Sequence, residues 1–271
     1  MMRSLWTAAS GMMTQQTNVD TISNNLANIN TTGYKKESAQ FKTLLYQTIQ
    51  QTSTNAEGEN KPSGIQVGLG VRNTAIVSQY TQGNLQETGN DYDFAIEGKG
   101  FFRVALSDGT IGYTRNGNFT MSVGSTGTTL ATAEGYPVLD TAGAPIVLDP
   151  NLDASLLEID ELGNLTYPDA NGDMQPLNMQ ISIAQFNNPA GMEKAGGSIL
   201  KETAASGAAR LESEDATLTK GKIHQGYLEG SNVQAVNEMV DLIVAQRAYE
   251  MNSKSITAAD EMLQQANNLR R

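Results

Sequence analysis

Few side chains in this chain have the chemistry of a catalytic or metal-binding site. His224 is the only histidine, and there is no cysteine. A single histidine cannot build a histidine-rich metal site unless carboxylates supply the other ligands. The absence of cysteine excludes disulfides, thiolate zinc sites and a cysteine nucleophile. We therefore interpret His224 as a surface residue that precedes a turn at Gly226.

Paired carboxylates offer another route to catalysis. Glu158 and Asp160, or Asp160 and Glu161, are the residue types that hydrolyse glycosidic bonds. Alternation along a strand would place Glu158 and Asp160 on one face, which we expect to face solvent. No aromatic-rich cleft is evident in the nearby sequence. We predict that the protein is not an enzyme, and an enzyme acting on cell-wall glycan is the alternative from a different class.

Two segments match ligand-binding loops only in part. In residues 169–173, glycine occupies the fourth position of a calcium loop instead of the sixth, and Gln180 stands where the bidentate glutamate belongs. In residues 64–70, a Gly-x-Gly is followed by Asn73 where a phosphate-binding loop has its third glycine. We predict tight turns and close packing here, with no catalytic residue, no cofactor and no metal.

The net charge of −11 resides mainly between the terminal segments. An acidic body without a basic patch argues against nucleic-acid binding. No window approaches the about 18 apolar residues of a membrane span, so we expect no membrane insertion. The N-terminus lacks a secretory signal pattern. If the protein leaves the cytoplasm, we expect a route that retains its N-terminus.

The two ends of the chain share a pattern typical of paired helices. Apolar positions recur at alternating steps of three and four, which places a narrow apolar stripe on one side of a helix and requires a partner. We expect the first helix over about Ser4–Ile29, with Ser4 as N-cap and Gly33 past its end. A capping-box spacing at Ser231–Gln234 predicts a last helix that continues to about Leu269.

Amides, rather than charges, occupy the other faces of the first helix. Such a surface suggests further neighbours, so we expect the helices to pair within the chain and then to contact other copies. The amides are Gln15, Gln16, Asn18, Asn24, Asn25 and Asn28. The residues that we expect to drive self-assembly are Leu5, Met12, Val19, Ile22, Leu26, Val240, Val244, Met251 and Met262.

The intervening chain has the texture of short β-strands. Asp108-Gly109 and Asn116-Gly117 separate β-prone runs over 100–106, 110–115 and 118–123, which predicts hairpins. We expect further strands around 136–139, 145–148, 156–159, 164–167 and 178–186, and a loop or linker over 52–63. The fold class is therefore α+β, with coiled-coil-like terminal helices and a β-rich, hairpin- or barrel-like outer domain.

Several segments resemble the rod and hook proteins of the bacterial flagellum. The resemblance covers both ends and the middle of the chain, in order. Within the family, the length and the run 62–71 are most similar to the distal rod members. The matching segments are 23–28 (Ser-Asn-Asn-Leu-Ala-Asn), 31–35 (Thr-Thr-Gly-Tyr-Lys), 93–102, 113–119, 225–229, 231–233, 246–250 and 260–263.

The resemblance implies a structural subunit that stacks helically into the hollow distal rod, the drive shaft that transmits torque across the periplasm to the hook. Implied partners are further copies, adjoining proximal rod and hook subunits, the surrounding periplasmic and outer-membrane rings, and the flagellar type III export apparatus, which exports without cleavage. We expect a terminal helical inner-tube domain (1–35 and 231–271), an extended connecting region (36–90 and 205–230) and an outer domain (91–204). Another rod or hook subunit is the nearest alternative.

Overall fold

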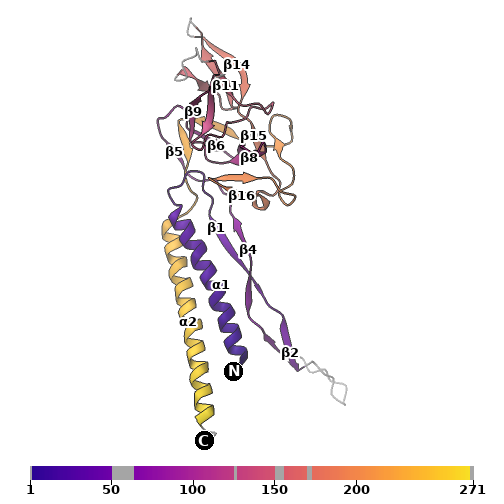
Figure 1. Cartoon of the computed structure of the whole chain (residues 1–271), viewed down its shortest axis with the longest axis vertical. Helices are drawn as coiled ribbons and strands as arrows, with labels where there is room; N and C mark the ends of the chain where they lie inside the picture. The colour runs from indigo at the N-terminus through magenta and orange to yellow at the C-terminus, as the bar shows by residue number, and fades with distance from the viewer. Residues whose placement is uncertain (1, 51–63, 125–126, 150–155, 170–172, 269–271) are drawn as a thin grey trace. The chain divides into compact units, whose positions relative to one another are not determined.

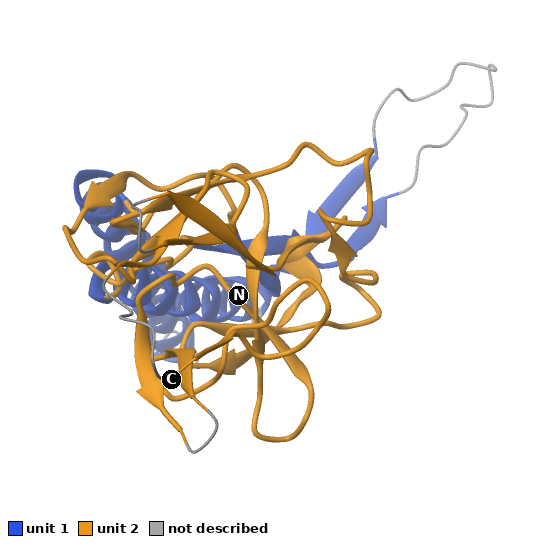
Figure 2. Cartoon of the chain, turned by 90° about the horizontal axis from the view of Figure 1, so that it is seen from above, with its two compact units in different colours: residues 1–27, 37–78, 234–271 blue, residues 28–36, 79–233 orange. Residues whose placement is uncertain are grey.

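The computed structural model describes residues 2–50, 64–124, 127–149, 156–169 and 173–268. It divides into two compact units, drawn in different colours in Figure 2. Unit 1 comprises Met1–Ala27, Glu37–Ser78 and Gln234–Arg271, so that both terminal helices belong to it. Unit 2 comprises Asn28–Lys36 and Gln79–Val233. The division of the chain into inner, connecting and outer domains remains a prediction.

Unit 1 is a helix pair accompanied by a β ribbon (Figure 1). Helices α1 (Met2–Ala27) and α2 (Ala235–Asn268) pack along one another. Strand β1 (Glu37–Thr43) pairs antiparallel with β4 (Val71–Ser78), and β2 (Tyr46–Gln50) pairs with β3 (Ile65–Gly68). Both β1 and β4 contact α1. None of the helices in the described ranges is long and apolar enough to cross a membrane.

The ends of both helices differ from the predicted ones. Helix α1 begins at Met2, before Ser4, and ends at Ala27, so Ser4 is not its N-cap. Helix α2 begins at Ala235 instead of Ser231. The Ser231 hydroxyl accepts a hydrogen bond from the Val233 amide at 3.2 Å, two residues on, which is a turn rather than a helix cap.

Unit 2 contains several small antiparallel sheets. The largest has the strand order β16-β17-β8-β7-β15-β18, with β16 and β18 as its edges. Among the described residues no sheet closes on itself, so the predicted barrel-like closure is wrong, whereas the α+β class is confirmed. Sheets β11-β10-β9, β12-β13-β14, β19-β6 and β20-β5 complete the unit. Its elements are β5 (Leu85–Glu87), β6 (Phe94–Glu97), β7 (Phe101–Ala105), β8 (Ile111–Thr114), β9 (Phe119–Val123), β10 (Thr128–Thr132), β11 (Val147–Leu148), β12 (Glu158–Ile159), β13 (Asn164–Pro168), β14 (Met174–Gln180), β15 (Ile183–Gln185), η2 (Pro189–Gly191), β16 (Glu193–Gly196), β17 (Ile199–Lys201), β18 (Arg210–Leu211), β19 (Lys222–Gln225) and β20 (Tyr227–Glu229).

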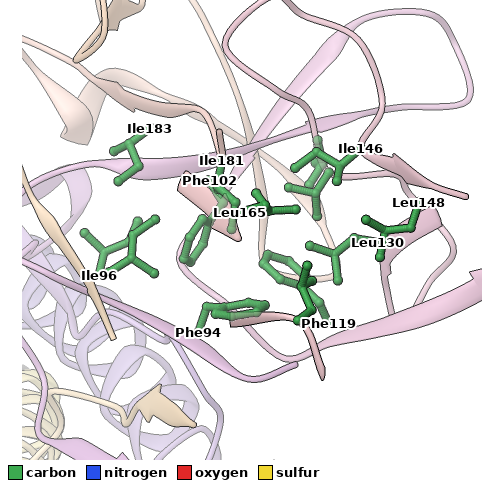
Figure 3. Close-up of a cluster of buried hydrophobic side chains, with 14 residues drawn as sticks. Phe94, Ile96, Phe102, Phe119, Leu130, Ile146, Leu148, Leu165, Ile181 and Ile183 are labelled. Carbon is green, nitrogen blue, oxygen red and sulfur yellow. The ribbon is translucent and has the colours of Figure 1, made fainter. Parts of the chain in front are cut away.

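The larger hydrophobic cluster of unit 2 is aliphatic and aromatic (Figure 3), and a smaller one lies around Phe101 and Tyr113. The rings of Phe102 and Phe119 meet at a centroid distance of 5.2 Å and 78°, an edge-to-face arrangement that aromatic pairs favour. Phe94 lies 6.0 Å from Phe119. Because β6, β7 and β9 each contribute one of these rings, the cluster joins three different sheets of the unit.

One of the two predicted hairpins is confirmed. Strands β7 and β8 pair across Asp108-Gly109, with Gly109 at φ 77°. The hairpin predicted at Asn116-Gly117 is wrong, because β9 does not pair with β8 but pairs with β10 in a different sheet. The carbonyl of Gly117 accepts from the amide of Phe94 at 3.0 Å, and a Cβ at Gly117 would lie 1.7 Å from the Phe94 carbonyl oxygen. Asn116-Gly117 therefore connects β8 to β9, which belong to two different sheets.

The other predicted strands are found in part. Residues 164–167 and 145–148 contain strands, and 178–186 splits into the end of β14 and all of β15. Residues 136–139 form only isolated bridges, such as Val104 with Val138. In segment 169–173, the Asp169 amide donates to the Asp173 carbonyl at 2.9 Å, and the residues between them lie outside the described ranges. The whole predicted loop 52–63 also lies outside them.

Candidate assembly surface

The contact of α2 with α1 follows a heptad of small and polar residues. Glu238, Ala245 and Ala259 are the buried residues of α2. Together with Asn252 they recur every seven positions, and Leu242, Tyr249, Ile256 and Leu263 fall between them at the complementary heptad positions. Small side chains at such positions let two helices approach closely. The pair is antiparallel, because Asn25 contacts Glu238 while Gly11 lies against Asn252.

Two polar residues of α2, Glu238 and Asn252, lie against α1 at two levels of this helix contact. Asn25 is completely buried: its side-chain amide donates to the carboxylate of Glu238 at 3.0 Å and to the Glu37 carbonyl at 2.8 Å, and it accepts from the Glu37 amide at 2.9 Å. A Cβ at Gly11 would lie 2.9 Å from the Asn252 Nδ2 atom. Gly11 therefore makes room for a side-chain amide. Asn25 is satisfied within the chain, which corrects the expectation that it faces other copies.

The ribbon covers a second side of α1. The Ser10 hydroxyl accepts from the Val71 amide at 3.3 Å, and Asn73 donates to the Thr17 hydroxyl at 2.6 Å. Gly70 has φ 113°, and a Cβ there would lie 2.2 Å from the Ser10 oxygen. The glycine-rich segment thus provides close packing on a helix, as predicted, and α1 is left with one uncovered side.

The predicted assembly residues fall into two groups in the structure. On α1, Ile22 is buried, and the other four are partly buried: Leu5, Met12, Val19 and Leu26. On α2, all four lie outside the α1 contact and are exposed. Their exposed fractions are 54% for Val240, 61% for Val244, 63% for Met251 and 52% for Met262. The α2 stripe seen in the sequence is thus a different side of the helix from the side that packs on α1.

Helix α2 therefore carries apolar residues on two sides. One side contacts α1, and the other exposes a cluster over its first turns: Val236, Met239, Val240, Ile243 and Val244. We call this cluster the α2 patch. A helix of a soluble protein that is apolar on two sides is typical of one that lies between two neighbours. Sequence periodicity identified part of this patch but assigned no separate role to Met239 or Ile243.

The candidate catalytic residues do not gather into a site. Glu158 and Asp160 are exposed, as predicted. His224 lies in β19, just before a turn at Gly226 as predicted, and its Nε2 is 2.7 Å from a carboxylate oxygen of Glu97. Among the described residues, no group of three or more histidine, aspartate or glutamate side chains has the geometry to hold a metal ion.

A buried ion cluster joins three segments of the sequence. The carboxylate of Glu229 in β20 lies 2.6 Å from Lys35 Nζ and 3.4 Å from Arg115 Nε, and it accepts from the Gly83 amide at 2.8 Å. All three charged side chains are buried. Burial lowers the pKa of Lys35 and of Arg115, although the carboxylate opposes this shift in both. Two cations and one carboxylate hold the chain after α1 and the chain before α2 in the same unit.

Arg115 also has partners beyond the carboxylate. Its guanidinium donates to the carbonyls of Ile96 at 3.2 Å and Gly98 at 2.5 Å, and it lies 5.9 Å from the Phe101 ring centroid. Each of Lys35, Arg115 and Glu229 falls in a segment that carries the flagellar resemblance. Sequence reasoning did not single out these residues, because the partners are far apart along the chain, up to 194 residues.

Three family models match the chain in order. The model described as "Flagella basal body rod protein" matches residues 5–35, the flagellar hook protein FlgE/F/G D1 domain matches 95–167, and the flagellar basal body rod FlgEFG protein C-terminal model matches 224–269. The first and last matches cover most of α1 and α2, and the middle one covers part of the β-rich unit.

Full-length relatives agree with these matches. The flagellar basal-body rod protein FlgG of Borreliella burgdorferi is 45% identical over 274 residues, covering 100% of both chains. FlgG of Agrobacterium fabrum is 45% identical over 264 residues, covering 96% of this chain and 97% of the relative. The flagellar hook-basal body complex protein FlhP of Bacillus subtilis is 34% identical over 280 residues, covering 100% of both.

The terminal helices, the β-rich unit and these matches place the chain in the class of flagellar rod and hook proteins. Within that class, the chain belongs to the FlgG family of flagellar basal-body rod proteins. The resemblance seen in the sequence is thereby confirmed.

Proposed function

We propose that this protein is a structural subunit of the distal rod of the bacterial flagellum. Copies stack helically through their terminal helices into a hollow shaft that transmits torque to the hook. The single observation that carries this proposal is the apolar side of α2 away from α1, whose large side chains are more than half exposed in the part of the chain that the structure describes. The full-length likeness to proteins named as basal-body rod proteins supports it.

The free energy of covering apolar side chains favours contacts between this side of α2 and further copies of the chain. Covering a large apolar side chain fully contributes about 1.5–3 kcal/mol, and the exposed α2 residues would gain roughly half of this each. Ordering two long helices opposes that gain by about 1–2 kcal/mol per residue. The helix pair therefore gains from contacts beyond itself. We propose that α1 and α2 form a coiled-coil-like inner-tube domain, in line with the heptad on α2, and that residues 91–204 form the outer domain.

Further partners belong to the same proposal. Adjoining rod and hook subunits, the surrounding ring proteins and the flagellar export apparatus are the partners of a rod in the periplasmic space. We propose a role without catalysis, which is supported by the exposed position of the candidate carboxylates Glu158 and Asp160. A turnover assay on peptidoglycan tests the alternative that the protein is an enzyme acting on cell-wall glycan. The likeness to FlhP favours another rod or hook-basal body subunit as the second candidate.

Polymerisation of the purified protein tests the proposal. We expect the wild-type chain to sediment as rods visible by electron microscopy. Met251→Asp places a charge on the exposed side of α2 and should abolish sedimentation without unfolding the chain, because Met251 is exposed. Gln264→Asp adds the same charge to the same helix, at an exposed position that lies 13 residues past Met251 and about 140° around the helix from it, and is the matched control. Normal rods from Met251→Asp would contradict the proposal.

A further inference from the structure

A buried polar pair lies between α1 and α2. Asn25 is 0% exposed and Glu238 is 1% exposed, and the side-chain amide of Asn25 donates to the Glu238 carboxylate at 3.0 Å. Burying polar groups costs free energy, and two apolar side chains of similar volume often hold such positions together at least as well. Stability alone therefore does not account for the pair. A single polar position in a contact between helices can instead fix which residues of the two helices face one another.

On each helix, small and polar residues recur every seven positions. They are Gly11, Asn18 and Asn25 on α1, and Glu238, Ala245 and Asn252 on α2. Gly11 lies against Asn252. The contact of Asn25 with Glu238 is 14 residues further along α1 and 14 residues back along α2. Asn18 and Ala245 lie midway between these contacts, so they are level with one another in the antiparallel pair.

A shift of α2 by one heptad would preserve the spacing but lose these matches. It would move α2 by about 10.5 Å along the helix axis. In one direction, Asn25 would lie level with Ala245, whose methyl group cannot accept the hydrogen bond of a buried amide. Asn18 would then lie level with Asn252, where the observed register places a glycine. This register therefore leaves a buried donor unpaired and crowds two amides.

The opposite shift is disfavoured for different reasons. Asn18 would lie level with Glu238, so the carboxylate would keep an amide partner. Asn25 would lie level with position 231, before the first residue of α2, and would lose the carboxylate. Gly11 would lie level with Ala245, which leaves a gap between two small residues and forfeits their packing contacts.

The position of Asn25 is itself fixed by the ribbon. Its side chain donates to the Glu37 carbonyl at 2.8 Å and accepts from the Glu37 amide at 2.9 Å. Further along the ribbon, the Val71 amide donates to the Ser10 hydroxyl of α1 at 3.3 Å. Helix α1 and the ribbon are thus held together without α2, and α2 is the element whose axial position the polar pair can set.

We infer that the Asn25–Glu238 and Gly11–Asn252 contacts set the axial register of α2 against α1. The first acts through a hydrogen bond that a shifted register loses, and the second through the match of a large side chain with a small one. Both contacts lie within one chain, so the register does not depend on the contacts between copies that the proposed function requires. A shifted register would displace the exposed side of α2 by about 10.5 Å relative to α1.

Spin labels measure this register directly. Asp20→Cys and Thr257→Cys, both at exposed positions, carry the labels, and the chain has no cysteine of its own. In the observed register the labels are 14 residues apart along the axis, or about 21 Å, and a shift by one heptad changes this to about 10.5 Å or about 31.5 Å. Double electron–electron resonance on the full chain in dilute solution, with trimethylamine N-oxide to favour the folded helices, should give one distance for the otherwise native chain.

The variant Glu238→Leu/Asn252→Ala removes both determinants and should give at least two distances that correspond to registers one heptad apart. The ratio of shifted to native register should rise about 10-fold or more, which is the effect of losing one hydrogen bond to a carboxylate. Glu238→Gln keeps an acceptor oxygen for Asn25 and should retain the native distance.

Thr14→Val/Thr21→Val is the matched control on α1. Both threonines are 5% exposed, and their hydroxyls donate to carbonyls of α1 itself. The control therefore removes two buried polar groups from the same helix without removing a bond to α2. It should retain the single native distance.

A single native distance in Glu238→Leu/Asn252→Ala would overturn the inference, and so would several distances in the otherwise native chain. Loss of the helical circular dichroism signal in this variant without shifted distances would also overturn it, because the two residues would then hold the helices together without selecting a register. Failure of wild-type protein to form rods would instead contradict the proposed function and leave the measured register in place.

Discussion

Removing the carboxylate of Glu229 should destabilise unit 2 more than any surface substitution in it. Glu229→Gln keeps the shape of the side chain and an oxygen for the Gly83 amide, but it removes the one carboxylate that both buried cations, Lys35 and Arg115, contact. Breaking a buried ion pair by removing one partner costs about 3–5 kcal/mol. Each kcal/mol lowers the melting temperature of a unit of this size by about 2–4 °C, so we expect a loss of about 6–20 °C.

The assay is calorimetric melting of the wild-type and variant chains at neutral pH. Glu87→Gln is the matched control, because Glu87 is exposed and lies in β5, paired with the strand that carries Glu229. It should stay within about 0.5 kcal/mol of wild type. The double variant Lys35→Met/Glu229→Gln removes one of the two uncompensated cations, so its cost should be less than the sum of the single costs.

A loss below about 1 kcal/mol for Glu229→Gln would refute the reasoning, because that is the range of an exposed ion pair. Strict additivity in the double variant would refute it as well, since the argument requires that Lys35 and Glu229 act on one another through direct contact.

Three further predictions concern other parts of the chain. Glu238→Ala should cost about 1–3 kcal/mol and speed amide hydrogen exchange in α2, because it removes an acceptor of the buried Asn25 amide; unchanged exchange would contradict this. Gly117→Ala should destabilise unit 2 by at least about 1–3 kcal/mol in urea unfolding, since its Cβ would overlap the Phe94 carbonyl; wild-type stability would show that the contact is absent. Hydrogen bonds from Thr217, the larger cause, and from Arg210 lower the pKa of Asp215 from 3.8 to about 2. The contribution of this carboxylate to folding stability is therefore present above pH 3.8 and is lost as the pH falls through about 2. The melting difference between wild type and Asp215→Asn should therefore shrink between pH 4 and pH 2, and a difference that grows in acid would contradict it.

The helices were predictable because their signal is local. Apolar spacing and the absence of breakers located both α1 and α2, with errors of a few residues at the ends. The side of α2 that packs on α1 was not predictable from apolarity. The residues of α2 that lie against α1 include Glu238, Ala245 and Asn252. These are less apolar than Val240 and Val244, which are exposed. Apolar periodicity finds the most hydrophobic stripe, whereas close helix packing selects small side chains.

The β structure was predictable where turns are local and not where pairing is distant. Asp108-Gly109 marked its hairpin correctly, because the two strands are neighbours in sequence. The ribbon strand β1 pairs with β4 from Glu37 to Ser78, across a long intervening segment, and no turn signal specifies such a partner. The ion cluster of Glu229 was hidden for the same reason, since only the tertiary fold brings its cations to it.

An electron cryo-microscopy reconstruction of the assembled polymer tests the central claim most directly. The claim is that the apolar residues exposed on α2 become covered by further copies of the chain. The account predicts a map in which Val240, Val244 and Met251 contact neighbouring subunits at the inner wall of the tube. A polymer in which these side chains remain in contact with solvent, and subunits join only through their β-rich units, would contradict it.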